Sequence, residues 1–444
     1  MSDTPSNDTR IESLGEAKIN TLLLNDSIGT SKEMFKTDDD RVLIDVNVNS
    51  ILEQLKKPES MPSFELAGPR EKIYFDPSKL KCAVVNCGGL CPGLNNVIRA
   101  IVLELHYRYQ VKHIYGIRYG LEGFIPEYGH ELVELTPDKV VNIHEMGGSI
   151  LGSSRGPQDI EAIVDCLERM NIGILFMIGG DGTLMAASKI VEEIKKRNAK
   201  ISVIGIPKTI DNDIYRVARS FGFDSAVDIA TEAIKGAHKE AEGFPNGVGM
   251  IKLMGRHSGF IAATSALAQQ DVNFVLIPEI DFDLEGENGL LSRLEKRLKE
   301  RKHAVIVVAE GAGQNFFQDS SSEYDASGNL KLYDIGVFLK DKIRSYFYEK
   351  SMDVTIKYID PSYMIRSLPA NPNDHVYCGF LGRDAVHAGM AGKTNMIIGH
   401  WNNFFVHVPI PMTAGKRKRV NPNGKIWQTV LEATGQGSLT NDKK

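Results

Sequence analysis

Two short loops carry acidic side chains at points where apolar segments end. The loop GGDGT at 179–183 follows the apolar run 172–178 and precedes a helical pattern. An aspartate held between glycines can bind Mg2+ on a triphosphate while neighbouring N–H groups grip the phosphates. This loop therefore indicates nucleotide chemistry, but it does not choose the acceptor.

The second acidic loop, PKTIDND at 207–213, follows the apolar run 201–206. It contains two carboxylates two residues apart and a threonine hydroxyl two residues before the first. Such a set can place a general base against an acceptor hydroxyl and a second acid near a metal. Aspartate-rich loops usually form turns or caps. A turn would leave the presence of GGDGT unexplained, so we favour the catalytic interpretation.

Two further loops could hold phosphate groups. Gly88 and Gly89 follow the run 82–86, and a glycine-rich turn before a helix offers N–H donors and partial positive charge to an anion. It is not a Walker A loop, because no Gly-Lys-Ser/Thr follows. The loop LGSSRG at 151–156 adds Arg155, whose fork of donors can bridge phosphate oxygens. Taken alone, the two loops also fit a tight turn and a surface salt bridge.

Short, continuous apolar runs precede most of these loops. Such runs indicate strands covered on both faces, and therefore parallel sheets flanked by helices. Ligands of open parallel sheets bind beyond the carboxyl ends of the strands, where these loops lie. We predict an α/β fold with two sheets. The predicted strands are 82–86, 172–178, 201–206, 247–253, 274–277 and 304–309, and the predicted helices include 183–197 and 290–301.

Composition argues against several classes of function. The 444-residue chain has a formal net charge of -5, and basic clusters are short. We interpret the cluster 416–419 as a solvated tail and expect no nucleic-acid partner. No apolar stretch approaches the roughly 18 residues of a membrane span, and the N-terminus lacks a signal pattern, so we expect a cytoplasmic protein without a membrane partner. Five scattered cysteines indicate neither a disulfide framework nor a zinc site.

Together these motifs resemble the phosphofructokinase family, and the resemblance runs from about residue 81 to about residue 407. GGDGT and PKTIDND are joined, in the family's order, by further motifs. These are MGR at 254–256, PE at 278–279, EG at 310–311 and YMIR at 363–366. The long N-terminal arm, PKTIDND in place of PGTIDND, and SYMIRS at 362–367 resemble the branch found in protists and plants.

The resemblance implies two Rossmann-like parallel-sheet lobes of the phosphofructokinase type. The implied domains are an N-terminal extension over 1–75, a nucleotide-binding lobe over 76–222 completed by about 365–400, a fructose 6-phosphate-binding lobe over 223–364 and a C-terminal segment over 401–444. The activity implied is transfer of the γ-phosphoryl group of ATP to the 1-hydroxyl of fructose 6-phosphate in glycolysis, with Mg2+ as cofactor. An allosteric homo-oligomer, commonly a tetramer, is implied as well.

The resemblance also assigns roles to single residues. Asp211 would accept the proton of the sugar hydroxyl, with Thr209 holding the phosphoryl group or the sugar, and Asp181, helped by Asp213, would hold Mg2+. Arg155 and Lys208 would assist catalysis. The donor phosphates would be lined by Gly88, Gly89, Arg155, Gly156, Gly180, Asp181, Gly182 and Thr183. Fructose 6-phosphate would be bound by Thr209, Asp211, Met254, Gly255, Arg256, Glu310, Tyr363 and Arg366. Tyr363 departs from the histidine of typical bacterial members.

Two positions bear on the phosphoryl donor. Pyrophosphate users of the family typically have an aspartate where this chain has Gly182, and its carboxylate would repel the α-phosphate of a nucleotide. Lys208, in contrast, resembles the lysine of pyrophosphate enzymes. A like-charge clash decides whether ATP can bind, whereas an extra lysine is compatible with either donor. We therefore expect ATP, with a pyrophosphate-dependent phosphotransferase as the alternative.

Two other interpretations compete with this one. An NAD kinase or lipid kinase would explain GGDGT, but not Thr209, Asp211 and Asp213 together with MGR at 254–256. A non-catalytic subunit of a kinase complex would be expected to lack an acid at 181 or 211, and both residues are aspartate.

Overall fold

The computed structural model describes residues 8–25, 29–56, 61–317, 324 and 330–441. These residues divide into two compact units. Unit 1 comprises the described residues up to Thr209, together with Ile214–Gly222 and Leu368–Arg417. Unit 2 comprises Ile210–Asp213, Phe223–Ser367 and the described residues from Lys418 onward. The predicted lobe 76–222 contains all of PKTIDND, whereas in the structure Ile210–Asp213 belong to unit 2.

The large sheet of unit 1 has nine strands among the described residues. They are β3 (Arg41–Leu43), β4 (Ser63–Leu66), β6 (Lys81–Asn86), β7 (His113–Ile117), β8 (Val133–Glu134), β9 (Ile174–Gly179), β10 (Ser202–Pro207), β16 (Met396–Trp401) and β17 (Phe404–Pro409). Their order is β3-β4-β17-β16-β10-β9-β6-β7-β8. The five strands from β16 to β7 are parallel, and the flanking strands join antiparallel.

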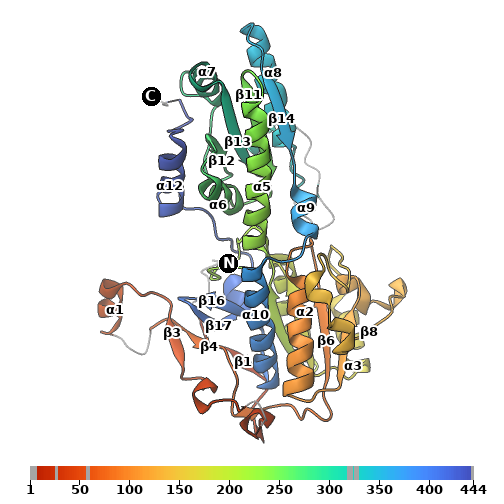
Figure 1. Cartoon of the computed structure of the whole chain (residues 1–444). Coiled ribbons are helices and arrows are strands. Elements are labelled where there is room, and N and C mark those ends of the chain that lie inside the picture. Colours follow the sequence, from red (N-terminus) through yellow and green to blue (C-terminus); the bar gives the residue numbers. More distant parts are fainter. Residues whose placement is uncertain (1–7, 26–28, 57–60, 318–323, 325–329, 442–444) are drawn as a thin grey trace. The chain divides into compact units, whose positions relative to one another are not determined.

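Helices cover both faces of this sheet, as the continuous apolar strands predict. Those of unit 1 are α1 (Val48–Gln54), α2 (Leu94–Leu103), α3 (Ile160–Arg169), α4 (Asp181–Lys196), α10 (Pro372–Met390) and α11 (Ile410–Thr413). Met177 of β9 packs in one core cluster with residues of α3 and α4. Phe176 faces the opposite way, toward Gly389 of α10. Figure 1 shows α10 lying beside α2, and the two helices pack together.

The predicted extension 1–75 is built into unit 1, apart from 1–7, 26–28 and 57–60, which lie outside the described residues. β3 and β4 extend the large sheet. Two separate two-stranded sheets pair β1 (Glu12–Ser13) with β15 (Lys393–Thr394) and β2 (Ile19–Asn20) with β5 (Lys72–Ile73). The buried Lys393 ammonium pairs with Asp38 at 2.6 Å and Glu65 at 3.3 Å. Strand pairing and buried charge therefore both tie this segment to the core.

The described strands of unit 2 form a four-stranded parallel sheet in the order β12-β13-β11-β14. The strands are β11 (Gly247–Leu253), β12 (Phe274–Leu276), β13 (His303–Ala309) and β14 (Thr355–Ile359). The helices are α5 (Phe223–Glu242), α6 (Phe260–Gln269), α7 (Leu290–Arg301), α8 (Ile335–Glu349), α9 (Ser362–Ser367) and α12 (Lys425–Thr434).

The alternation of side chains along β11 determines how the helices of unit 2 pack. Val248 and Met250 join a core cluster with residues of α7 and α8. Gly249 faces α5, and an added Cβ there would lie 2.6 Å from the Ala237 carbonyl oxygen. Glycine on this face therefore lets α5 lie close against the sheet, as Figure 1 shows.

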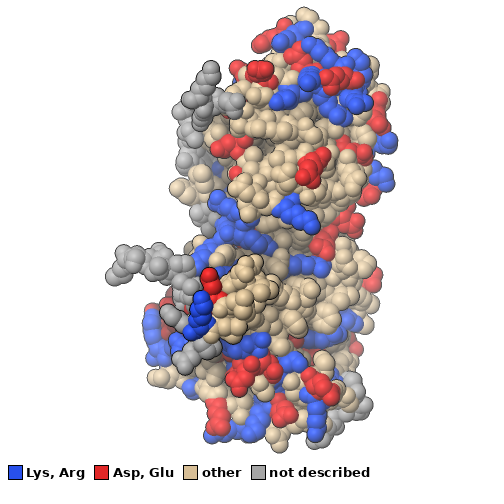
Figure 2. Space-filling view, turned by 90° about the vertical axis from the view of Figure 1, so that its left-hand side faces the viewer, with Lys and Arg blue, Asp and Glu red and all other residues tan. Residues whose placement is uncertain are grey.

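Sequence and structure agree on the elements that were predicted by residue range. The six predicted strands correspond to β6, β9, β10, β11, β12 and β13, and the two predicted helices correspond to α4 and α7. These predictions are confirmed. At the upper end of the face shown in Figure 2, acidic and basic side chains are intermixed. The helix α7 of unit 2, LLSRLEKRLKER, carries side chains of both signs.

The start of α2 offers a test of the packing in unit 1. Gly93 caps this helix with φ 102°, and an added Cβ would lie 2.7 Å from Cys378 Sγ and 2.9 Å from Phe221 Cδ2. Gly93→Ala should lower the free energy of unfolding by about 1–3 kcal/mol, because it combines left-handed strain with overpacking. Urea unfolding followed by circular dichroism measures this change.

The matched control is Gly379→Ala in α10, where no heavy atom lies within 4 Å of the added Cβ. That substitution should raise the free energy of unfolding by up to about 1 kcal/mol, because alanine is the better helix former. Equal unfolding curves for the two variants would contradict the packing described at Gly93.

Candidate active site

Three neighbouring strands of unit 1 lead into loops that the sequence analysis identified. β6 ends before Gly88, β9 ends at Gly179 of GGDGT and β10 ends before Lys208. Because β10, β9 and β6 are adjacent and parallel, their carboxyl ends lie at the same edge of the sheet. The fold therefore brings these three loops together, as predicted for ligand-binding loops of parallel sheets.

Two cations lie against the glycine turn that follows β6. Lys208 is buried, with a residue exposure of 7%, and its Nζ donates a hydrogen bond to the Gly89 carbonyl at 2.7 Å. A Cβ added at Gly88, which has φ 82°, would lie 3.3 Å from Lys208 Nζ, and one added at Gly89 would lie 3.5 Å from Arg155 Nη2. Lysine and arginine at a glycine turn are well suited to phosphate.

The loop that contains Arg155 is hydrogen-bonded to the same glycine turn. Ser153 Oγ donates to the Gly88 carbonyl at 2.6 Å, and the Gly88 N–H donates to the Ser154 carbonyl at 3.0 Å. The sequence analysis predicted that glycine N–H groups of this turn donate hydrogen bonds to a phosphate. In the structure, the Gly88 N–H already has a partner within the protein. The positive side chains, rather than that N–H, are therefore the groups this turn offers to an anion. Gly156, next to Arg155, has φ 99°.

Asp181 is the first residue of α4, and Gly180 precedes it as the N-cap. Its half-buried carboxylate accepts a hydrogen bond from the Gly415 N–H at 2.8 Å. Gly182 is exposed, with no heavy atom within 4 Å of an added Cβ, whereas Thr183 is buried and packs against Gly179. An accessible carboxylate is the kind of ligand that Mg2+ takes, so Asp181 fits this ion.

In unit 2, three adjacent parallel strands lead to the predicted sugar-phosphate residues. β11 is followed by Met254, Gly255 and Arg256, β13 by Glu310, and β14 by α9, which contains Arg366. Contacts join these segments: the Gly311 N–H donates to the Gly255 carbonyl at 3.1 Å, and Arg366 Nε lies 3.3 Å from Met254 Sδ. The structure thus brings these predicted residues together at one edge of the sheet.

Asp211 lies among these residues of unit 2. Its carbonyl oxygen accepts a hydrogen bond from Ser258 Oγ at 3.3 Å. Burial, helped by the charges of Asp213 and Glu310 and opposed by Arg366, raises the pKa of Asp211 to about 7. A carboxyl group with a pKa near neutrality suits a general base, since proton transfer is most efficient when the pKa is near the working pH.

The interpretation of 416–419 as a solvated tail is wrong for Lys418. Its Nζ donates to Asn212 Oδ1 at 3.0 Å, and its backbone N–H donates to the Asp213 carbonyl at 2.7 Å. Burial lowers the pKa of Lys418 to about 8, although Asp213 acts in the opposite direction. Sequence reasoning missed this residue because a run of basic residues near the C-terminus gives no sign of the acidic loop it packs against.

Glu279 belongs to the motif PE at 278–279. In the structure, its carboxylate joins two segments of unit 2 by hydrogen bonds. Its carboxylate accepts hydrogen bonds from the Gly259 N–H at 3.0 Å and from the Val420 N–H at 2.8 Å. Burial raises the pKa of Glu279. The C-terminal residues near Lys418 are thereby fastened to the loop that follows Arg256.

Other predicted site residues are exposed or have hydrogen-bond partners within the protein. Tyr363 is 84% exposed at the start of α9, whereas Ile365 is buried. The Arg256 guanidinium donates to the Leu330 carbonyl, and the Thr209 carbonyl accepts from Ser220 Oγ at 2.7 Å. Asp181 belongs to unit 1 and Asp213 to unit 2, so a Mg2+ site shared by them remains a prediction.

The described part of the chain has no helix with the length and apolar character needed to span a bilayer.

Comparison with known proteins identifies the family. The phosphofructokinase family model matches residues 81–389. An ATP-dependent 6-phosphofructokinase of Borreliella burgdorferi is 51% identical over 97% of this chain and 97% of its own. The ATP-dependent 6-phosphofructokinase 7 of Arabidopsis thaliana is 47% identical over 86% of this chain and 78% of its own.

A solved structure confirms the fold. The pyrophosphate-dependent phosphofructokinase of Marinobacter aquaeolei matches with a TM-score of 0.66 and 20% identity, over 80% of this chain and 91% of its own. The α/β fold of phosphofructokinase type is therefore confirmed, and so is the resemblance drawn from GGDGT and PKTIDND. The chain belongs to the phosphofructokinase family.

Proposed function

We propose that this protein is an ATP-dependent 6-phosphofructokinase, which converts fructose 6-phosphate and ATP to fructose 1,6-bisphosphate and ADP. The observation that supports this most is the position of Asp211, a carboxyl group with a pKa near 7, among Glu310 and Arg366 of the same unit. The relatives described above, at 47% and 51% identity, carry the name of this activity.

In the proposed reaction, Asp211 takes the proton from the 1-hydroxyl of fructose 6-phosphate. The sugar oxygen forms a bond to the γ-phosphorus, and the bond from that phosphorus to the β,γ-bridging oxygen breaks, so ADP leaves with the electron pair. Lys208 and Arg155, which lie against Gly88 and Gly89, stabilise the negative charge of the donor phosphates. Thr209 holds the transferred group or the sugar.

The remaining proposed roles concern the two substrates and the metal. Asp181, helped by Asp213, would hold Mg2+, which neutralises phosphate charge when it is bound. Gly156, Gly180 and Thr183 would line the donor phosphates. Met254, Gly255, Arg256, Glu310, Tyr363 and Arg366 would bind fructose 6-phosphate. A homotetramer, allosteric control and a cytoplasmic location are further proposals, which rest on the resemblance.

The choice of ATP over pyrophosphate rests on Gly182. No heavy atom lies within 4 Å of an added Cβ, so the protein leaves the space beside this residue open. Lys208 is compatible with either donor, because its hydrogen bond to the Gly89 carbonyl does not depend on which phosphate compound binds at the glycine turn. The pyrophosphate-dependent reaction remains the alternative.

Replacing the proposed base tests the acid–base step. Asp211→Asn should lower kcat by a factor of about 10^2 or more, the usual scale of general-base catalysis, and leave fructose 6-phosphate binding largely intact. The control is Asp213→Asn, whose loss of activity should be partly reversed by raising the Mg2+ concentration. Near-normal turnover of Asp211→Asn, or its rescue by Mg2+, would rule out the role as base.

Adding a charge at position 182 tests the donor. Gly182→Asp should lower kcat/KM for ATP by about 10^2-fold or more, because two like charges about 4 Å apart near a protein surface repel by about 4 kcal/mol. Gly182→Asn has almost the same size and no charge, so it should keep most of the ATP activity. If both variants retained ATP activity equally, charge at this position would not select the donor.

Removing one arginine tests the sugar-phosphate site. Arg366→Ala should raise KM for fructose 6-phosphate by about 10- to 100-fold, because a hydrogen bond to a charged group contributes about 1.5–3 kcal/mol. KM for ATP should change little. Arg344→Ala is the control, since Arg344 is exposed on α8 and pairs with Asp341. The assignment fails if both arginine variants have the same KM for the sugar phosphate.

A further inference from the structure

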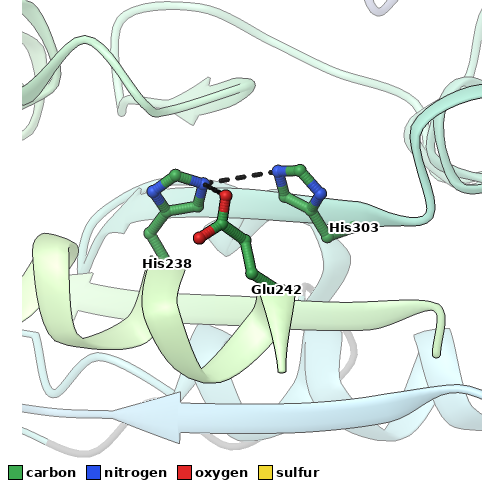
Figure 3. A group of neighbouring side chains, drawn as sticks. All are labelled: His238, Glu242 and His303. Atoms are coloured by element: carbon green, nitrogen blue, oxygen red, sulfur yellow. Dashed lines mark hydrogen bonds and ion pairs between the residues drawn. The ribbon is translucent and has the colours of Figure 1, made fainter. Parts of the chain in front are cut away.

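Two histidines and a glutamate of unit 2 point their ligand atoms toward one another, as Figure 3 shows. His238 and Glu242 are four residues apart on α5 and so lie on the same face of the helix. His303 is the first residue of β13. His238 Nε2 lies 3.3 Å from His303 Nε2 and 3.4 Å from Glu242 Oε1.

The partners of the other ring nitrogens determine which nitrogens carry protons. His238 Nδ1 lies 3.1 Å from Asp271 Oδ2, and His303 Nδ1 lies 3.2 Å from the Arg301 carbonyl oxygen. Carboxylate and carbonyl oxygens are acceptors, so each Nδ1 carries a proton. When both rings are neutral, both Nε2 atoms present lone pairs to each other and to the Glu242 carboxylate. Three acceptors facing one another repel unless a proton or a metal cation lies between them.

The spacing of these atoms matches a tetrahedral metal centre. With Zn–N distances of about 2.0–2.1 Å, two ligands of a tetrahedral zinc ion are separated by about 3.3–3.4 Å. The two separations given above, 3.3 Å and 3.4 Å, agree with this value. The carboxylate on His238 Nδ1 completes the carboxylate–histidine arrangement that orients metal-binding imidazoles. We propose that His238, Glu242 and His303 bind a divalent transition-metal ion, with Zn2+ as the preferred ion.

The nature of the ligands and their accessibility specify the ion further. Imidazole with carboxylate suits Zn2+ and its neighbours, whereas Mg2+ prefers oxygen ligands alone. The His238 side chain is 12% exposed, His303 is half-buried and Glu242 is exposed, so an ion can enter from the Glu242 side and keep water as its fourth ligand. Gln269 Nε2, which donates to Asp271 Oδ2 at 2.7 Å, fixes the supporting carboxylate.

This metal site is separate from the proposed catalytic residues of unit 2. His303 begins β13, whereas Glu310 follows the end of that strand seven residues later. Seven residues of strand span about 20 Å, so the two lie at opposite edges of the same sheet. A metal here would join the end of α5 to the beginning of β13. Its expected effect is therefore on the stability of unit 2 and not on the phosphoryl group.

The test uses the full-length protein after removal of metals with a chelator. Zn2+ is added in competition with a chromophoric chelator, with Mg2+ in millimolar excess to occupy oxygen-only sites. We expect one Zn2+ per chain to bind in this competition and to raise Tm. His303→Ala and Glu242→Gln should weaken binding by at least about 10-fold, and Asp271→Asn by about 10- to 100-fold, as is usual for a residue that supports a ligand.

The matched control is His375→Ala, which alters a histidine whose ring lies 6.0 Å from that of His144. Zn2+ binding should not change in that variant. Because Glu242 is exposed, Glu242→Gln should fold even if a histidine variant does not. X-ray absorption of the zinc-loaded protein should show imidazole nitrogen and oxygen ligands. The proposal is overturned if no Zn2+ binds in the competition, or if Glu242→Gln and His303→Ala bind as tightly as the wild type.

Discussion

Parallel pairing of buried strands is the constraint on which both units depend. Adjacent parallel strands deliver their carboxyl ends to a single edge, and helices cover both faces, so the loops at that edge are the part of the chain left for chemistry. In unit 1 this edge carries Lys208 against Gly88 and Gly89. In unit 2 it carries Arg256 and Glu310, while His303 lies at the opposite edge.

Burial then determines what these groups can do. Asp211 lies where burial and the neighbouring carboxylates disfavour its ionised form, and its pKa is raised to about 7 as a result. Lys418 packs against the same acidic loop, and burial lowers its pKa to about 8. Desolvation brings the pKa values of this acid and this base close to neutral pH, and such perturbed pKa values are typical of functional sites. These pKa shifts support the proposal that the acidic loop takes part in catalysis.

Sequence reasoning found the elements whose local pattern is strong. β9, β10 and β13 are continuous apolar runs because helices cover them on both faces. β14 (Thr355–Ile359) was missed because every residue in it is only half-buried, and β3 and β4 were missed because strands of three and four residues are too short to show such a run. The contacts of Lys418 and Gly415 could not be predicted, since no local pattern shows where a distant segment returns.

The central claim is that Asp181 and Asp211 act on the same phosphoryl group. A crystal structure with Mg2+, a non-hydrolysable ATP analogue and fructose 6-phosphate tests it most directly. The account predicts that Asp181 binds the Mg2+ on the nucleotide and that the Asp211 carboxylate lies about 2.6–3.2 Å from the sugar 1-hydroxyl, within hydrogen-bond reach. Carboxylates of Asp181 and Asp211 that face different cavities, with the sugar 1-hydroxyl remote from Asp211, would contradict it.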